Sequence, residues 1–189
     1  MPTTPGQNPL GVTQEAEGIT QILQDSSTLE CLERPSAERV LQHLPNYGGV
    51  HFACHGVSSS DPADSHLLLL NDHTGEVDKL RVKDIAALKL PTARLAYLSA
   101  CSTANNTSSE LVDEVTHISS SFHIAGFAHV IGTLWPSQDQ ACQEIALSFY
   151  SALSKTNTVA LSYHTAIMRL MKEKSSDQLY WAPFIHFGA

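Results

Sequence analysis

The order of hydrophobic and polar positions predicts helices that alternate with short buried strands. Apolar residues recur at helical spacing over residues 12–25, 36–44, 82–88, 110–125, 138–153 and 157–171. The apolar runs between them predict strands at 50–54, 67–70, 77–80, 94–100, 128–135 and 181–187. This alternation is typical of an α/β protein, with a mostly parallel sheet flanked by helices on both faces.

Two of the predicted strands end in residues that are capable of chemistry. His55 and Gly56 directly follow the strand 50–54, and Cys101 directly follows the strand 94–100. In open parallel sheets, ligands bind beyond the carboxyl ends of the strands. If these two strands are parallel neighbours, we expect His55 and Cys101 to lie in one crevice.

A cysteine and a histidine in one crevice are typical of nucleophilic catalysis. Cysteine attacks a carbonyl carbon as a thiolate, and a nearby histidine accepts the thiol proton. Gly56 has no Cβ, so its N–H can approach a substrate closely and, with the N–H of Cys101, form an oxyanion hole. The residues alone leave an alternative open, in which Cys101 is a small core residue and His55-Gly56 is a turn.

Composition and charge exclude several classes of protein. The chain has 189 residues, of which 42% are hydrophobic and 16% charged, so it suits a single domain with a packed core. Its formal net charge of -8 disfavours contact with nucleic acid or with an anionic membrane. No apolar run approaches the roughly 20 residues that a membrane-spanning helix needs. Residues 1–30 also lack the basic and apolar regions of a secretory signal.

The cysteines and histidines do not predict a metal site. The four cysteines are Cys31, Cys54, Cys101 and Cys142. They form no CxxC pair, so we expect free thiols in a reducing compartment and place the protein in the cytoplasm. His51 and His55 lie on one predicted strand, roughly 13 Å apart, too far to share a metal. We therefore expect no metal and no other cofactor, and we interpret Cys54, on the opposite strand face from His55, as a core residue.

Seven short segments match one known family in their order and spacing. They are 51–56 (HFACHG), 65–69 (SHLLL), 98–103 (LSACST), 122–126 (FHIAG), 130–136 (VIGTLWP), 149–150 (FY) and 181–184 (WAPF). Together these segments resemble the CHAT domain, a caspase-like peptidase domain that often follows tetratricopeptide repeats. The resemblance covers nearly the whole chain.

The resemblance implies a caspase-like three-layer fold and a cysteine endopeptidase. In that family the histidine of the His-Gly pair is the base and the cysteine of the Ser-Ala-Cys segment is the nucleophile, which correspond here to His55 and Cys101. The implied partners are a protein or peptide substrate and an upstream repeat or sensor domain that controls activity. The alternative function is a catalytically silent CHAT scaffold that acts as a protein-interaction module.

The resemblance also indicates a substrate pocket and two departures from the family. We assign Asp139, Trp135 and Ser65 to the pocket, with Asp139 facing a basic side chain; the alternative for Asp139 is an acid in the first turn of a helix. After Cys101 the family tends to carry an acidic residue, Thr and Gly, whereas this chain has 102–104 (STA). The family's first strand is also missing, so we expect residues 1–189 to be one CHAT domain cut from a longer protein.

Overall fold

The computed structural model describes residues 3–7, 9–25, 27–57, 59, 61–71, 73–99, 111–135 and 137–188, with the backbone alone at 111–117. The α-helices are α1 (Val12–Leu23), α2 (Ala37–His43), α3 (Val82–Ala86), α4 (Leu111–Ala125), α5 (Asp139–Thr156), α6 (Val159–Glu173) and α7 (Gln178–Trp181), with 3-10 turns η1 (Leu44–Asn46) and η2 (Pro62–Asp64). The strands are β1 (Gly49–Ala53), β2 (Gly56–Val57), β3 (His66–Leu70), β4 (Val77–Arg81), β5 (Leu95–Ser99), β6 (His129–Thr133) and β7 (Phe184–Gly188).

The strands form two sheets. The larger one has the order β1-β5-β6-β7, in which β1, β5 and β6 are parallel and β7 is antiparallel. The smaller one is antiparallel, with the order β2-β3-β4. The predicted α/β class with a mostly parallel sheet is confirmed.

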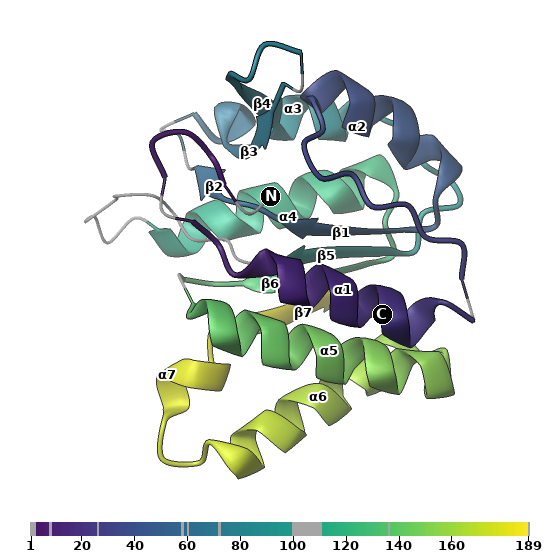
Figure 1. Ribbon diagram of the computed structural model, residues 1–189, viewed down its shortest axis with the longest axis vertical. Helices are drawn as coiled ribbons and strands as arrows, with labels where there is room; N and C mark the ends of the chain where they lie inside the picture. Colours follow the sequence, from purple (N-terminus) through teal and green to yellow (C-terminus); the bar gives the residue numbers. More distant parts are fainter. Residues whose placement is uncertain are drawn as a thin grey trace.

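Helices cover both faces of the larger sheet, and the alternation of side chains along its strands explains why. On β5, Leu95 and Tyr97 point into a core formed with α1, α5 and α6, whereas Ala96 and Leu98 point into a core formed with α2, α3 and α4. Figure 1 shows these two layers below and above the sheet. The central strands β5 and β6 are therefore buried on both faces, as their apolar sequence predicts.

Local signals at the helix ends agree with the pattern of the sequence. The Ser36 hydroxyl accepts a hydrogen bond from the backbone N–H of Arg39 and caps α2. Helix α4 ends at Gly126, where φ is 121° and the N–H groups of Gly126 and Phe127 both donate to the carbonyl of Phe122. Serine and glycine are residue types that favour a helix cap and a helix stop, respectively.

Two boundaries differ from the prediction. The last strand begins at Phe184, because residues 178–181 form the short helix α7. Helix α5 runs from Asp139 to Thr156 and so continues beyond residue 153, where the predicted helix ends. Apolar residues are common to short buried helices and to buried strands, so the pattern of residues 178–187 does not separate the two.

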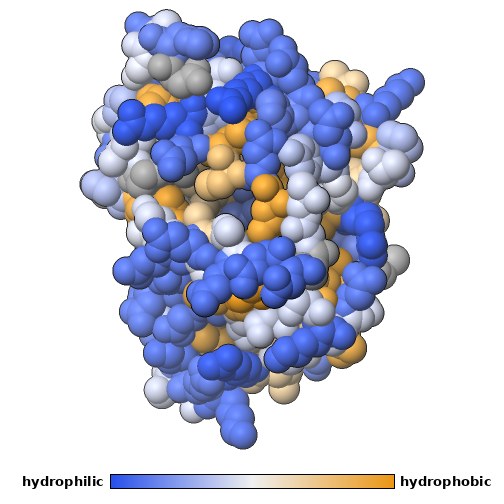
Figure 2. Space-filling model, turned by 45° about the vertical axis from the view of Figure 1, so that its right-hand side comes forward, coloured by the Kyte–Doolittle hydropathy of each residue, from blue (hydrophilic) through white to orange (hydrophobic). Residues whose placement is uncertain are grey.

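The mostly polar character of the surface agrees with the composition of the sequence, which has no long apolar run. The face in Figure 2 is mostly hydrophilic, and its apolar residues gather around a hollow near the middle. In the described part of the chain, no helix combines the length and the apolar character needed to cross a membrane.

Candidate active site

His55 lies just beyond the carboxyl end of β1 and is fixed by its backbone. Its carbonyl accepts a hydrogen bond of 2.8 Å from the N–H of Leu68 in β3, so the smaller sheet begins where β1 ends. Only 3% of His55 is exposed. The chain around this residue is therefore held in place before any substrate binds.

The strands that lead to His55 and Cys101 are parallel neighbours, which was the condition set by the sequence. Their register pairs Ala53 of β1 with Ser99 of β5. In the sequence, His55 lies two positions after Ala53 and Cys101 two positions after Ser99. Cys101 itself lies outside the described residues, as does the departure from the family pattern at 102–104.

The other cysteine close to this edge is a core residue, as predicted. Cys54 is 3% exposed and packs in the cluster that contains Phe52 and Leu98. Burial raises the pKa of the Cys54 thiol to about 11, because the thiolate would lose its hydration. Cys54 is therefore protonated at neutral pH and unsuited to be a nucleophile.

Gly56 directs its N–H away from the smaller sheet. It pairs with Leu67 of β3, and the preceding carbonyl, that of His55, accepts the hydrogen bond from Leu68. In an antiparallel ladder this makes Gly56 and Leu67 a pair without hydrogen bonds between them. The N–H of Gly56 thus faces the side of the strand opposite β3.

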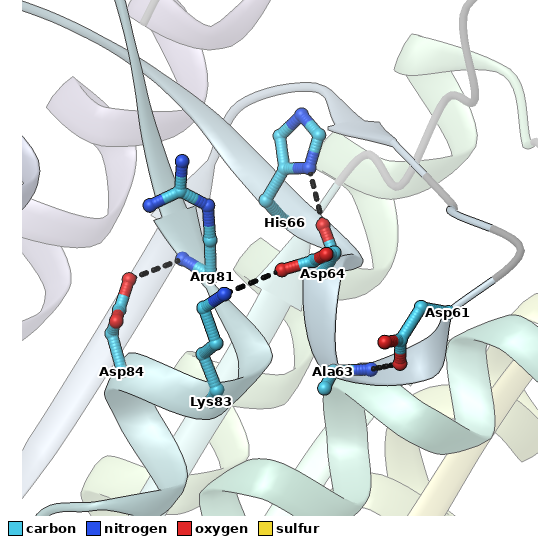
Figure 3. A network of polar contacts seen from close by, with 7 residues as sticks. All are labelled: Asp61, Ala63, Asp64, His66, Arg81, Lys83 and Asp84. Carbon is cyan, nitrogen blue, oxygen red and sulfur yellow. Dashed lines mark hydrogen bonds and ion pairs between the residues drawn. The ribbon is translucent and has the colours of Figure 1, made fainter.

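Ser65, predicted for the substrate pocket, is fully buried in a turn. Its hydroxyl accepts a hydrogen bond of 3.1 Å from the N–H of Ser59, and its carbonyl accepts one from Val82. Beside it, the Asp64 carboxylate lies 2.7 Å from Lys83 Nζ, and the Asp64 carbonyl lies 2.8 Å from His66 Nδ1 (Figure 3). The contacts of Ser65 hold the start of β3, and its role toward substrate stays a prediction.

Asp139 and Trp135, the other two residues that the sequence predicts for the pocket, follow the carboxyl end of β6. The Asp139 carboxylate accepts a hydrogen bond of 3.1 Å from the N–H of Gly11, the residue that precedes α1. This contact satisfies an N–H at the start of α1 and places a negative charge at the positive ends of both α1 and α5. Trp135 is half-buried. The contact with Gly11 supports the alternative for Asp139, in which it is an acid in the first turn of a helix. Its role in a substrate pocket stays a prediction.

Sequence reasoning missed a buried acid–base cluster on the α1 side of the sheet. Glu15 of α1 is 2% exposed, and its Oε1 lies 3.1 Å from Nε2 of His51 in β1. The Nδ1 of His51 lies 3.1 Å from the Tyr150 hydroxyl of α5, and the imidazole stacks on Tyr97 of β5 at 4.8 Å. The available signal was Glu15 itself, an acid on the buried stripe of α1 together with Val12 and Ile19.

The Glu15 carboxyl is ionised although it is buried. Burial alone raises its pKa, but the hydrogen-bonding and charge interactions with His51, helped by the Ser99 hydroxyl, bring the pKa below its ordinary value. The negative charge of Glu15 in turn adds to burial in raising the pKa of the Tyr97 and Tyr150 hydroxyls, which are neutral. The cluster thus holds a charged carboxylate beneath the middle of β1 and β5, where His51 and Tyr97 are paired.

The described residues include no group of three or more His, Cys, Asp or Glu side chains arranged to hold a metal ion. Comparison with known families matches the chain to the CHAT domain over residues 2–189. No curated protein matches the chain.

Proposed function

Because the chain belongs to the CHAT domain family, whose fold and ancestry are those of caspase-like peptidases, we propose that it is a cysteine endopeptidase that uses Cys101 and His55. The observation that carries the proposal is the register of β1 and β5. Ala53 and Ser99 are paired on parallel neighbouring strands, and the two reactive residues follow each of them by the same two positions. Parallel strands present their carboxyl ends at one edge, where enzymes of this class bind substrate.

The proposed reaction proceeds through a thioester. The Cys101 sulfur attacks the scissile carbonyl carbon while His55 takes the thiol proton. The N–H groups of Gly56 and Cys101 stabilise the negative oxygen. His55 then gives the proton to the leaving amine, the C–N bond breaks, and water attacks the thioester to release the acid and regenerate the thiol.

The burial of His55 supports control by an upstream domain or a partner. With 3% exposure, the imidazole is shielded by the surrounding chain, so a substrate reaches it only after that cover has shifted. We propose an upstream repeat or sensor domain as the source of this shift, and a protein or peptide as the substrate. The thiols of Cys31 and Cys54 form no disulfide, which supports a reducing compartment, for which we propose the cytoplasm.

A peptidyl electrophile tests the proposed nucleophile. The protein with its native upstream region is incubated with a panel of peptidyl acyloxymethyl ketones, and the labelled residue is located by mass spectrometry. We expect labelling at Cys101, its loss in Cys101→Ala and a strong reduction in His55→Ala. Cys31→Ala is the matched control, because Cys31 is an exposed free thiol away from the strand ends. Equal labelling of wild type and Cys101→Ala would leave the scaffold alternative in place.

A further inference from the structure

The buried contact between Glu15 and His51 joins the sheet to two helices of one layer, α1 and α5, at one imidazole. His51 lies on β1, the strand that leads to His55, and its ring contacts Glu15 of α1, Tyr150 of α5 and Tyr97 of β5. The His51 side chain is 16% exposed and that of Glu15 only 3%. Nε2 of the imidazole faces the Glu15 carboxylate and Nδ1 faces the Tyr150 hydroxyl, so both polar edges of the ring have a polar neighbour.

The same cluster reaches the second strand of the proposed site. The imidazole of His51 stacks on Tyr97 of β5 with ring centroids 4.8 Å apart. Tyr97 is also the register partner of His51 in the paired strands. The carboxylate from α1 therefore contacts the strand that leads to His55 and, through the imidazole, the strand that leads to Cys101.

Helix α1 is itself held in register with α5. The Gly11 N–H donates to Asp139, and Gln143 Nε2 of α5 lies 3.5 Å from Gln14 Oε1 of α1. At Gly18 the two helices come so close that an added Cβ would lie 2.6 Å from Leu147 Cδ2. These contacts determine where along the sheet Glu15 enters the core.

We propose that Glu15 is a positioning residue for the active centre, an inference that rests on the proposed function. Its carboxylate, which α1 places against His51 on one face of the paired strands β1 and β5, holds the strand that leads to His55 in place, so that the docking of α1 is a condition for the reactivity of Cys101. Glu15 acts through His51 and is not a catalytic residue. An element that moves α1 therefore regulates the peptidase without touching its substrate.

The decisive variant is Glu15→Gln, which keeps the shape of the side chain and removes its charge. Its matched control is Glu17→Gln, the same change on the same helix at an exposed position. Both variants are made in the full chain, checked for folding by circular dichroism, and labelled with the peptidyl electrophile across pH. The rate is separated into the inactivation rate constant and the binding constant of the electrophile.

We expect Glu15→Gln to lower the inactivation rate constant by about 10- to 100-fold and to shift its pH profile, with little change in the binding constant. Glu17→Gln retains the wild-type values. The double variant Glu15→Gln/His51→Gln loses no more than Glu15→Gln alone, because the two residues act as one unit. The proposal is overturned if a folded Glu15→Gln labels within about twofold of Glu17→Gln at every pH.

Two further measurements separate this proposal from the proposed function. If the wild type is not labelled at Cys101, the peptidase proposal fails. Backbone hydrogen exchange at residues 51–55 and 95–99 then tests whether Glu15 positions the two strand ends. Faster exchange in both segments for Glu15→Gln, and not for Glu17→Gln, supports positioning of the strand ends, whereas unchanged exchange overturns it. If Glu15→Gln does not fold, Tyr150→Phe removes only the hydroxyl from His51 and is expected to lower the labelling rate in the same direction; a wild-type rate would contradict the proposal.

Discussion

Gly126, at the end of α4, is the position where the smallest change in side chain should have a large effect. Its φ is +121°, and a Cβ built there would lie 2.5 Å from the carbonyl oxygen of Leu90 and 3.1 Å from its carbonyl carbon. The N–H of Leu90 donates to the carbonyl of Ala125 at 2.7 Å, which ties this backbone to the end of the helix. Because backbone atoms, and not a flexible side chain, block the Cβ, neither the end of α4 nor the backbone of Leu90 can move away without a large cost in free energy.

Two costs add up in Gly126→Ala. A non-glycine residue held at this φ costs about 1–3 kcal/mol. Forcing an extra methyl group into a packed site costs about 1–3 kcal/mol more. For a domain of this size, each kcal/mol lowers Tm by about 2–4 °C. Gly126→Ala should therefore lower the free energy of unfolding by about 2–6 kcal/mol and Tm by roughly 5–20 °C.

Gly75→Ala separates the two costs. Gly75 also has a positive φ, +70°, but no heavy atom lies within 4 Å of an added Cβ. This control should lose only the conformational part, about 1–2 kcal/mol. Urea and thermal unfolding, followed by circular dichroism, give both values. Equal losses in the two variants would refute the argument from the Leu90 carbonyl.

Two more predictions concern the core and the pH dependence of stability. Phe122 is 0% exposed and packs against Phe52 with ring centroids 5.5 Å apart. Phe122→Ala should lower the free energy of unfolding, measured in urea, by about 3–5 kcal/mol. The control Ile124→Ala changes a residue that is 69% exposed and should lower it by less than about 0.5 kcal/mol. Burial lowers the pKa of His129 and of His186 below the ordinary 6.5, so the unfolded chain binds protons more readily than the folded one. Stability should therefore fall as the pH drops below about 6.5, and His186→Gln should show a shallower fall in a series of melting temperatures; an unchanged slope in this variant would contradict the assignment.

The sequence was sufficient for the elements whose signals are local. Apolar runs located β5 and β6, because strands buried on both faces need mostly apolar residues. The helix ends at Ser36 and Gly126 also depend on local signals, since the serine hydroxyl and the conformational freedom of glycine act within a few residues. The parallel pairing of β1 with β5 was a condition in the sequence argument, and the structure supplies it.

The rest depends on partners that are distant in the sequence. Asp139 contacts Gly11, which is 128 positions away in the sequence, and His51 contacts Tyr150, which is 99 positions away. Neither pair has a characteristic spacing, so only the folded chain identifies them. Glu15 illustrates the difficulty: an acid on a helix stripe is usually exposed, and its burial becomes favourable only with His51 opposite. The assignments of His55 and Cys101 came from strand-end chemistry and from the family resemblance, and they stay predictions.

The alternation of side chains along β5 also limits how the gene for this protein can vary in length. Adding or deleting one codon between Leu95 and Ser99 would exchange the residues that face the two helical layers, and the tyrosine and the leucines would each meet a core of the wrong shape. The hairpin turn between β3 and β4 has no such restriction, because Gly75 and its neighbour Thr74 are exposed. Reporter peptides or affinity tags placed inside the domain therefore belong in that turn.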